Sequence, residues 1–317
     1  MITIITESSG RSGNSTPVRR KLVWMSGFWV LLFLSGCATV FKPEPPLAPT
    51  VQADMPKKLP KIGLALGGGA ARGFAHVGVI QVLEEAGIRP DLVVGTSAGS
   101  LVGAIYASGK TGAQLQQVAE SMEEAALTDW TLPLFSRGVF RGEALARYVS
   151  NQVNGRTIES MSIPLGIVAT DLQSGQGVLF RQGDVGIAVR ASSAVPAVFL
   201  PVRINGREYV DGGLVAPVPV RYAREMGAEL VVAVDISSSP DANLANDTLQ
   251  LLLQTFAIMG SSINRYELTG ADLVVKPSLA NLKGADFTTR RRAIEAGRAA
   301  MLSALPPLRA LIAEKSR

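Results

Sequence analysis

The feature that most limits how this chain can fold is a set of short runs in which successive residues are apolar. A strand with one solvated face alternates apolar and polar residues, whereas a strand covered on both faces is apolar at successive positions. Stretches with helical spacing separate the runs, as in a chain that alternates strand and helix. We therefore predict an α/β fold with three layers, α/β/α, around a mostly parallel central sheet. The runs lie at residues 62–66, 92–95, 164–170, 230–235 and 273–276.

Helical segments are expected between and after these runs, and they would fill the outer layers. A chain of 317 residues with 47% hydrophobic and 18% charged residues can bury a substantial core and has the composition of a globular protein. No internal repeat is present in the sequence. The segments with helical spacing are residues 75–86, 98–108, 111–126, 249–268 and 290–305.

Ser97 directly follows the second apolar run and has a glycine two residues away on each side, Gly95 and Gly99. Such neighbours allow a sharp strand-to-helix turn that exposes a nucleophilic hydroxyl at its apex. The usual base for such a serine is a histidine, but His76 is the only one in the chain. We interpret His76 as a packing or capping residue, and a catalytic role for it is the main alternative.

A glycine-rich loop follows the first run and ends at Gly73. A dinucleotide fingerprint fails there, because Arg72 or Ala70 occupies a position that requires glycine. A phosphate-binding Walker loop fails as well, because Phe74 follows Gly73 where lysine is needed. An oxyanion hole needs only backbone N–H donors aimed at a developing negative charge. We therefore expect the loop and the turn at Ser97 to be two halves of one site.

In this combination the motifs resemble those of the patatin-like phospholipases, in their bacterial type. The resemblance covers about residues 62–235 and departs from the family pattern at Ala216, where members often carry asparagine, and at Ala70, where they carry a third glycine. The matching segments are the loop 67–73, the turn 95–99, the segment 191–196, and Asp211 followed by Gly212 and Gly213.

The resemblance implies a Ser–Asp dyad, with Ser97 as the nucleophile and Asp211 as the general base, and it implies no metal or organic cofactor. A solvated aspartate with a pKa near 4 is a poor base, so we expect Asp211 to be partly desolvated. The resemblance also implies an oxyanion hole formed by the amides of Gly68, Gly69 and Ala98. Support of the loop and the turns is assigned to Gly67, Arg72, Gly73, Gly95, Gly99, Gly212 and Gly213.

Other charged residues leave alternatives open. Asp171 and Asp235 also end apolar runs, so spacing alone offers them as the base. We expect Arg72 to hold the glycine loop, with a lipid phosphate as its alternative partner. The arginines at 290–292 are expected to be the solvated start of a helix, and contact with anionic lipid head groups is the weaker alternative.

The first part of the chain is predicted to be a lipoprotein leader. A basic cluster at 19–21 precedes an apolar stretch at 22–34, which is short for a membrane span. The stretch leads to Cys37, the only cysteine, in a pattern that resembles a bacterial lipobox. We predict a signal peptide at 1–36, a lipidated Cys37 with a proline-rich tether at 37–60, and a hydrolase domain at 61–317. An uncleaved signal anchor is the alternative.

Charge and the anchor together limit the partners. The leader carries four basic residues and one acidic residue, which is +3 of the formal net charge of +5 and leaves +2 for the rest. A nucleic-acid partner is therefore not indicated. Ala38 after Cys37 resembles outer-membrane sorting in Gram-negative bacteria, so we predict an anchor in the outer membrane that faces the periplasm.

These observations predict an exported, lipid-anchored serine hydrolase that cleaves acyl esters of phospholipids, lysophospholipids or related lipids. The alternative is a catalytically silent lipoprotein that binds acyl chains or partners with the same fold. The sequence does not indicate which protein partners the chain has.

Overall fold

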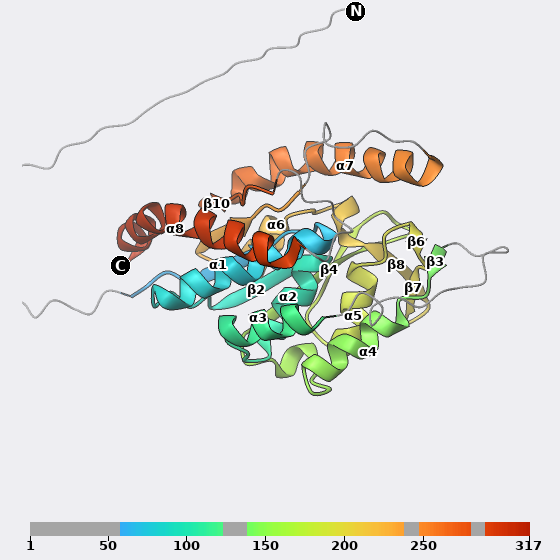
Figure 1. Ribbon diagram of the computed structural model, residues 1–317, viewed down its shortest axis with the longest axis horizontal. Coiled ribbons are helices and arrows are strands. Elements are labelled where there is room, and N and C mark those ends of the chain that lie inside the picture. Colours follow the sequence, from blue (N-terminus) through green and yellow to red (C-terminus); the bar gives the residue numbers. More distant parts are fainter. Residues whose placement is uncertain (1–57, 123–137, 238–246, 280–288) are drawn as a thin grey trace, which may run out of the picture. The chain divides into compact units, whose positions relative to one another are not determined.

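The computed structural model describes residues 58–122, 138–237, 247–279 and 289–317. Its centre is an eight-stranded sheet with the order β10-β9-β1-β2-β4-β8-β7, in which β5 also pairs with β4 (Figure 1). A separate pair is formed by β3 and β6. The strands are β1 Ile62–Leu66, β2 Leu92–Thr96, β3 Gly138–Phe140, β4 Leu165–Asp171, β5 Gly177–Phe180, β6 Ala197–Phe199, β7 Val202–Ile204, β8 Arg207–Asp211, β9 Leu230–Val234 and β10 Leu273–Val275.

The predicted mostly parallel sheet is confirmed. Strands β10, β9, β1, β2 and β4 run parallel to one another, and each contains one of the five apolar runs. Strands β5 and β8 pair with β4 in the antiparallel sense, and β7 pairs with β8 in the same way. The antiparallel end of the sheet was not expected, because its strands are short and only partly buried.

The helices form layers on the two faces of the sheet (Figure 1). Helices α1, α2 and α8 contribute to the core on one face, and α6 packs on the other. α3 packs on α1, and α4 packs on α5 next to β4 and β8. Bounds of the helices are α1 Phe74–Glu85, α2 Ala98–Ala107, α3 Gly112–Ser121, α4 Glu143–Gln152, α5 Val185–Ser192, α6 Val220–Glu225, α7 Thr248–Glu267 and α8 Arg290–Lys315.

Two cores explain why the central strands are apolar at successive positions. Every residue of β1, β2, β4 and β9 is buried. Leu64 and Leu66 of β1 enter the core under α1, α2 and α8, whereas Ala65 enters the core under α6. Side chains alternate between faces along a strand, so both sets of positions must be apolar.

Helix α8 is longer than the sequence predicted, because it continues beyond residue 305 through Pro306 and Pro307 and ends at Lys315. Proline inside a helix removes a hydrogen bond and costs about 3 kcal/mol. Leu308, directly after the two prolines, is fully buried in the core, and this packing favours continuation of the helix.

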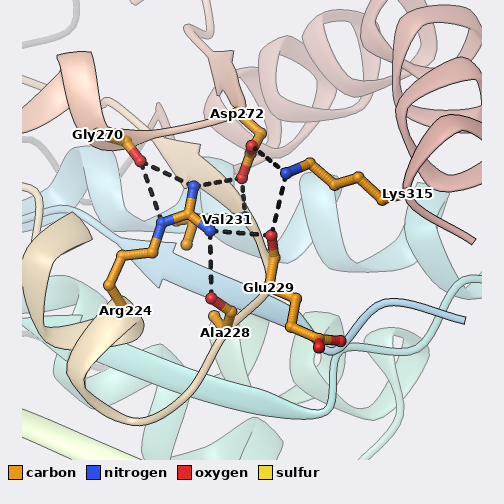
Figure 2. A network of polar contacts seen from close by, with 7 residues as sticks. All are labelled: Arg224, Ala228, Glu229, Val231, Gly270, Asp272 and Lys315. Atoms are coloured by element: carbon orange, nitrogen blue, oxygen red, sulfur yellow. Dashed lines mark hydrogen bonds and ion pairs between the residues drawn. The ribbon is translucent and has the colours of Figure 1, made fainter. Parts of the chain in front are cut away.

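The end of α8 is also tied to the sheet by a polar network (Figure 2). Asp272 accepts from the Val231 amide at 2.7 Å, and its carboxylate pairs with Arg224 of α6 and with Lys315 of α8 at 3.1 Å. Burial opposes ionisation of this carboxyl group, but the hydrogen bonds from Val231, Lys315 and Arg224 outweigh it and lower the pKa of Asp272. The network joins α6, β9, β10 and α8 at the ends of the strands where β9 and β10 begin.

The predicted signal peptide, Cys37 and the tether up to residue 57 lie outside the described residues. Among the helices that the structure does describe, none combines the length and the apolar character needed to cross a bilayer.

Candidate active site

Ser97 lies where β2 ends and α2 begins, at the carboxyl edge of the parallel sheet. Its backbone has a φ of 51°, a value that few residues other than glycine adopt. Gly95 and Gly99 are required next to it, because a Cβ at Gly95 would collide with the backbone of Gly99, and one at Gly99 with the carbonyl of Leu66. The sequence therefore folds into the sharp turn that was predicted.

Hydrogen bonds hold the turn in this unusual conformation. The Ser97 amide donates to Ser192 Oγ at 2.8 Å, and the Ser192 hydroxyl donates in turn to the carbonyl of Val168 at 2.6 Å. The Ser100 hydroxyl donates to the Ser97 carbonyl at 2.6 Å. Sequence reasoning included Ser192 in a matching segment but gave it no role, because its partner is 95 residues away in the chain.

Asp211 ends β8, whose register pairs it with Ala169 of β4. The side chain is buried, and Oδ1 accepts from the Gly213 amide at 2.7 Å. Burial raises the pKa of Asp211 to about 6, against the lowering effect of hydrogen bonds from the Gly213 amide and the Ser97 hydroxyl. Oδ2 is buried and has no partner of regular hydrogen-bond geometry in the described residues. The Ser97 hydroxyl is therefore one of the two hydrogen-bonding groups that act on the Asp211 carboxyl group.

The two glycines after Asp211 allow this close approach. Gly212 begins the short 3-10 helix η4, Gly212–Leu214, and a Cβ there would collide with the carbonyl of Val168. At Gly213 a Cβ would lie 2.9 Å from Asp211 Oδ1, which is too close. Backbone and carboxylate contacts therefore leave no room for a Cβ at either glycine.

The glycine-rich loop lies against the turn at Ser97. A Cβ at Gly68 would lie 3.2 Å from Ser97 Cβ, and one at Gly73 would lie 2.8 Å from Ala98 Cβ. The loop is held from outside, since the Gly67 amide donates to the Val234 carbonyl at 3.1 Å. The loop and the turn are therefore in direct contact, so the sequence correctly predicted that they are neighbours.

Backbone donors at this junction are not all available to a ligand. The Gly68 amide donates to the Pro217 carbonyl at 2.9 Å. The amides of Gly69 and Ala98 have no backbone or side-chain acceptor in the described part of the chain. Of the three predicted oxyanion donors, the amides of Gly69 and Ala98 are therefore free to donate a hydrogen bond to a negatively charged oxygen in this conformation.

Comparison with known proteins assigns this arrangement to a family. Residues 64–224, which contain the loop, Ser97 and Asp211, match the family model of the patatin-like phospholipases. The chain belongs to the patatin-like phospholipase family. The resemblance found in the sequence is confirmed at this level.

Patatin-like relatives are found in bacteria and in mammals. An uncharacterized NTE family protein of Mycobacterium bovis is 37% identical over 189 residues, which is 59% of this chain and 52% of that protein. Patatin-like phospholipase domain-containing protein 6 of Mus musculus is 32% identical over 230 residues, 70% of this chain and 16% of that protein. The chain thus spans about half the length of the mycobacterial relative.

A solved structure shares the fold. VipD from Legionella pneumophila aligns with a TM-score of 0.56 and 15% identity, over 78% of this chain and 67% of VipD. At this identity the likeness concerns the fold alone, and it agrees with the patatin fold that the family model indicates.

His76 is not positioned as a base in this patatin-like site. It is fully buried in α1, and Nε2 lies 2.8 Å from the Gly67 carbonyl, an arrangement in which Nε2 carries the proton and donates it. Nδ1 is buried without a partner in the described residues. Burial lowers the pKa of His76 to about 4, so the ring is neutral at pH 7. The histidine packs and holds the loop, in agreement with the preferred interpretation of the sequence.

The alternative aspartates have other partners. Asp171 pairs with Arg207 at 2.6 Å and accepts from the amides of the turn that follows it. Asp235 pairs with Lys276 at 3.2 Å and accepts from the Ser237 amide. Both carboxylates are thus engaged in ion pairs and turn capping, and in the described part of the chain neither forms a hydrogen bond with Ser97.

Three of the four candidate lipid-binding arginines have partners within the chain. Arg72 Nε donates to the Ile236 carbonyl at 2.8 Å, which ties the loop to the segment after β9. Arg290 donates to the carbonyls of Ala119 and Glu120, and Arg291 pairs with the Glu120 carboxylate at 3.3 Å. These contacts favour structural roles for all three.

Proposed function

We propose that this chain is a lipid acyl-ester hydrolase in which Ser97 is the nucleophile and Asp211 the general base. Its substrates are phospholipids, lysophospholipids or related acyl lipids. Membership of the patatin-like phospholipase family supports the reaction class. The observation that carries the proposal is the buried carboxyl group of Asp211, with its raised pKa, next to the strained Ser97 turn.

In the first half of the proposed reaction, Ser97 Oγ attacks the ester carbonyl carbon and its proton passes to Asp211. A pKa of about 6 makes Asp211 a stronger base than a solvated aspartate, yet leaves it ionised at pH 7. The amides of Gly69 and Ala98 stabilise the oxyanion of the tetrahedral intermediate. The intermediate collapses to an acyl-enzyme, and Asp211 returns its proton to the departing alkoxide.

In the second half, water attacks the acyl carbon on Ser97 and gives its proton to Asp211. Collapse of the second tetrahedral intermediate breaks the bond to Ser97 Oγ and releases a carboxylic acid. The proton on Asp211 returns to Ser97 Oγ, so the enzyme is regenerated. Each step uses one proton acceptor and the same amide donors, and none requires a group from outside the chain except water and substrate.

Labelling with a fluorophosphonate probe tests the nucleophile directly. We expect modification of the wild-type protein on the peptide that contains Ser97, and none in Ser97→Ala. Ser303→Ala is the matched control, because that exposed hydroxyl only donates to the Ala299 carbonyl within α8. Wild-type protein that neither reacts with the probe nor hydrolyses a short-chain ester would favour the silent lipid-binding lipoprotein instead.

The base assignment is tested by comparing two variants on a soluble short-chain ester. Asp211→Asn removes the proton acceptor and should reduce kcat almost as much as Ser97→Ala. His76→Gln should keep most activity, because the glutamine amide can still donate to the Gly67 carbonyl. The opposite ranking would assign the base to His76.

Attachment to a membrane is part of the proposal. Its support is the lipobox-like pattern before Cys37 and the proline-rich segment after it. A lipid on Cys37 would hold the hydrolase beside an insoluble substrate, and we propose the periplasmic face of a bacterial outer membrane as its location.

A further inference from the structure

Helix α7 exposes an unusual concentration of large apolar side chains. Half of the large hydrophobic residues that are exposed in the described part of the chain lie within eleven positions of this one helix. Leu251 and Ile258 are 59% and 50% exposed. These exposed residues are Leu249, Leu251, Leu252, Leu253, Ile258 and Met259.

The same part of α7 lacks charge. From Thr248 to Asn264 the sequence contains no Asp, Glu, Lys or Arg. Surface helices of soluble proteins normally carry charged residues on the face turned toward water. An exposed helix segment that is apolar and uncharged is the type of surface that marks an interaction site.

Contacts of α7 connect this surface to the candidate active site. The helix packs on η4, the turn directly after Asp211. Asn264 Oδ1 accepts from the Val218 amide at 3.1 Å, and the neighbouring Pro217 carbonyl accepts from the Gly68 amide of the glycine loop. The carboxyl-terminal half of α7 is therefore fixed next to the loops of the site, while its amino-terminal half carries the apolar surface. In Figure 1 the helix lies along the outside of the sheet and the α6 layer.

We infer that the amino-terminal half of α7 docks onto the surface of a phospholipid bilayer. The inference rests on the proposed function, because a hydrolase of bilayer lipids must bring its site to the surface where the substrate lies. Side chains of leucine size enter the boundary between head groups and acyl chains. The absence of charge on this segment means that apolar insertion drives the docking and that anionic lipid is not required.

The test compares two substrates with the full chain. Leu251 and Ile258 are seven residues apart, two helical turns, so they point in the same direction. The double variant Leu251→Glu/Ile258→Glu keeps good helix formers on α7. We expect unchanged hydrolysis of a soluble short-chain ester, and at least about a tenfold loss of hydrolysis in phosphatidylcholine vesicles, because two apolar side chains no longer enter the bilayer.

Ile187→Glu and Leu302→Glu are the matched controls, since these residues are 42% and 51% exposed on α5 and α8. Neither control should change the ratio of vesicle to soluble activity. Equal ratios for the double variant and the wild type, or an equal loss in the controls, would overturn the docking surface. Unchanged thermal unfolding of the double variant verifies that its fold is intact.

A second readout does not depend on turnover. Hydrogen exchange of the amides in residues 248–260 should slow when phosphatidylcholine vesicles are added, and the protection should persist at high salt. Protection that disappears at high salt would overturn apolar docking. Unchanged exchange with vesicles, together with a concentration-dependent dimer that the double variant abolishes, would instead assign the surface to a second copy of this chain. If the wild type hydrolyses neither substrate, the proposed function fails and hydrogen exchange alone decides on the docking.

Discussion

Replacing Asp211 by asparagine should stabilise the protein at neutral pH while it abolishes hydrolysis. Burial raises the pKa of Asp211 from its ordinary value of 3.8 to about 6, which means that the folded state disfavours the carboxylate. At about 1.4 kcal/mol for each pKa unit, the penalty is about 3 kcal/mol. The neutral side-chain amide of asparagine does not incur this penalty. Its oxygen can accept from the Gly213 amide in place of Oδ1, and its nitrogen can donate to the Ser97 hydroxyl.

The pH dependence follows from the direction of the shift. Because the pKa of Asp211 is higher in the folded state, the unfolded chain loses this proton first as pH rises. In the wild type, protonated Asp211 costs the folded state nothing at low pH. As pH rises from 3.8 to about 6, the free energy of unfolding falls, and it is not regained at higher pH. The advantage of Asp211→Asn should be about 3 kcal/mol at pH 8, about half of that at pH 5, and close to zero below about pH 3.

Thermal and urea unfolding of the wild type and the variant at pH 5, 6, 7 and 8 measure this difference. A gain of about 3 kcal/mol corresponds to roughly 6–12 °C in Tm for a domain of this size. Asp171→Asn is the control of opposite sign, because hydrogen bonds from the turn after Asp171 lower the pKa of that carboxyl group. Asp171→Asn should therefore lower the free energy of unfolding of the protein at pH 8. If Asp211→Asn is no more stable than the wild type at pH 8, or if its advantage is the same at pH 5 and pH 8, the reasoning is refuted.

Four further outcomes are expected. The wild-type kcat/KM on a soluble ester should be level above pH 6 and fall about tenfold per pH unit below it, as the Asp211 carboxylate is protonated. A pH profile without this fall would contradict the assignment of Asp211 as the base. Ser192→Ala leaves the Ser97 amide without its acceptor, so the free energy of unfolding should fall by about 1–3 kcal/mol. The kcat should fall with little change in KM. Asp272→Asn weakens the network in Figure 2 and should lower Tm without changing kcat, since Asp272 lies at the opposite ends of the strands from Ser97. Cys37→Ser should move the protein out of the membrane fraction, and an unmodified Cys37 in the mature wild type, seen by mass spectrometry, would exclude the lipid anchor.

The sequence predicted those parts of the fold and site that local patterns determine. Successive apolar residues identified the five parallel strands, since burial on both faces leaves no polar positions. The flanking Gly95 and Gly99 identified the turn at Ser97, because backbone contacts there exclude any Cβ. Parallel strands place their carboxyl ends at one edge, so the loop after β1 and the turn after β2 had to be neighbours.

Other features depend on partners that are distant in sequence. No local pattern reveals that Ser192 accepts from the Ser97 amide or that Pro217 occupies the Gly68 amide. The continuation of α8 through Pro306 and Pro307 depends on burial of Leu308 in a core built from other segments. Local propensity predicts a helix end there, and tertiary packing overrides it.

Departures from the family pattern show how the loop tolerates change. Ala70 stands where a third glycine is usual and has a φ of 50°, which costs an alanine about 1–2 kcal/mol. The loop is nonetheless fixed by bonds to the carbonyls of Val234, Pro217 and Ile236. At Ala216, where asparagine is common, the backbone carbonyl accepts from the Thr96 hydroxyl at 2.9 Å. The contact at Ala216 thus uses its backbone carbonyl, and the bonds that fix the loop come from Gly67, Gly68 and Arg72, so neither depends on the missing side chains.

In the proposed mechanism, the instability of the Asp211 carboxylate contributes to catalysis. Attack by Ser97 transfers a proton to Asp211 and neutralises a charge that burial disfavours by about 3 kcal/mol. That energy opposes the high cost of deprotonating a serine hydroxyl, and as an upper limit it corresponds to a rate factor on the order of 100. A solvated aspartate would not provide this contribution. The hydrogen bond from Gly213 limits the shift, so the carboxyl group stays ionised at neutral pH and remains a base. Burial, opposed by the hydrogen bonds from the Gly213 amide and the Ser97 hydroxyl, sets the pKa of Asp211 at a value where the proposed dyad can act without an imidazole.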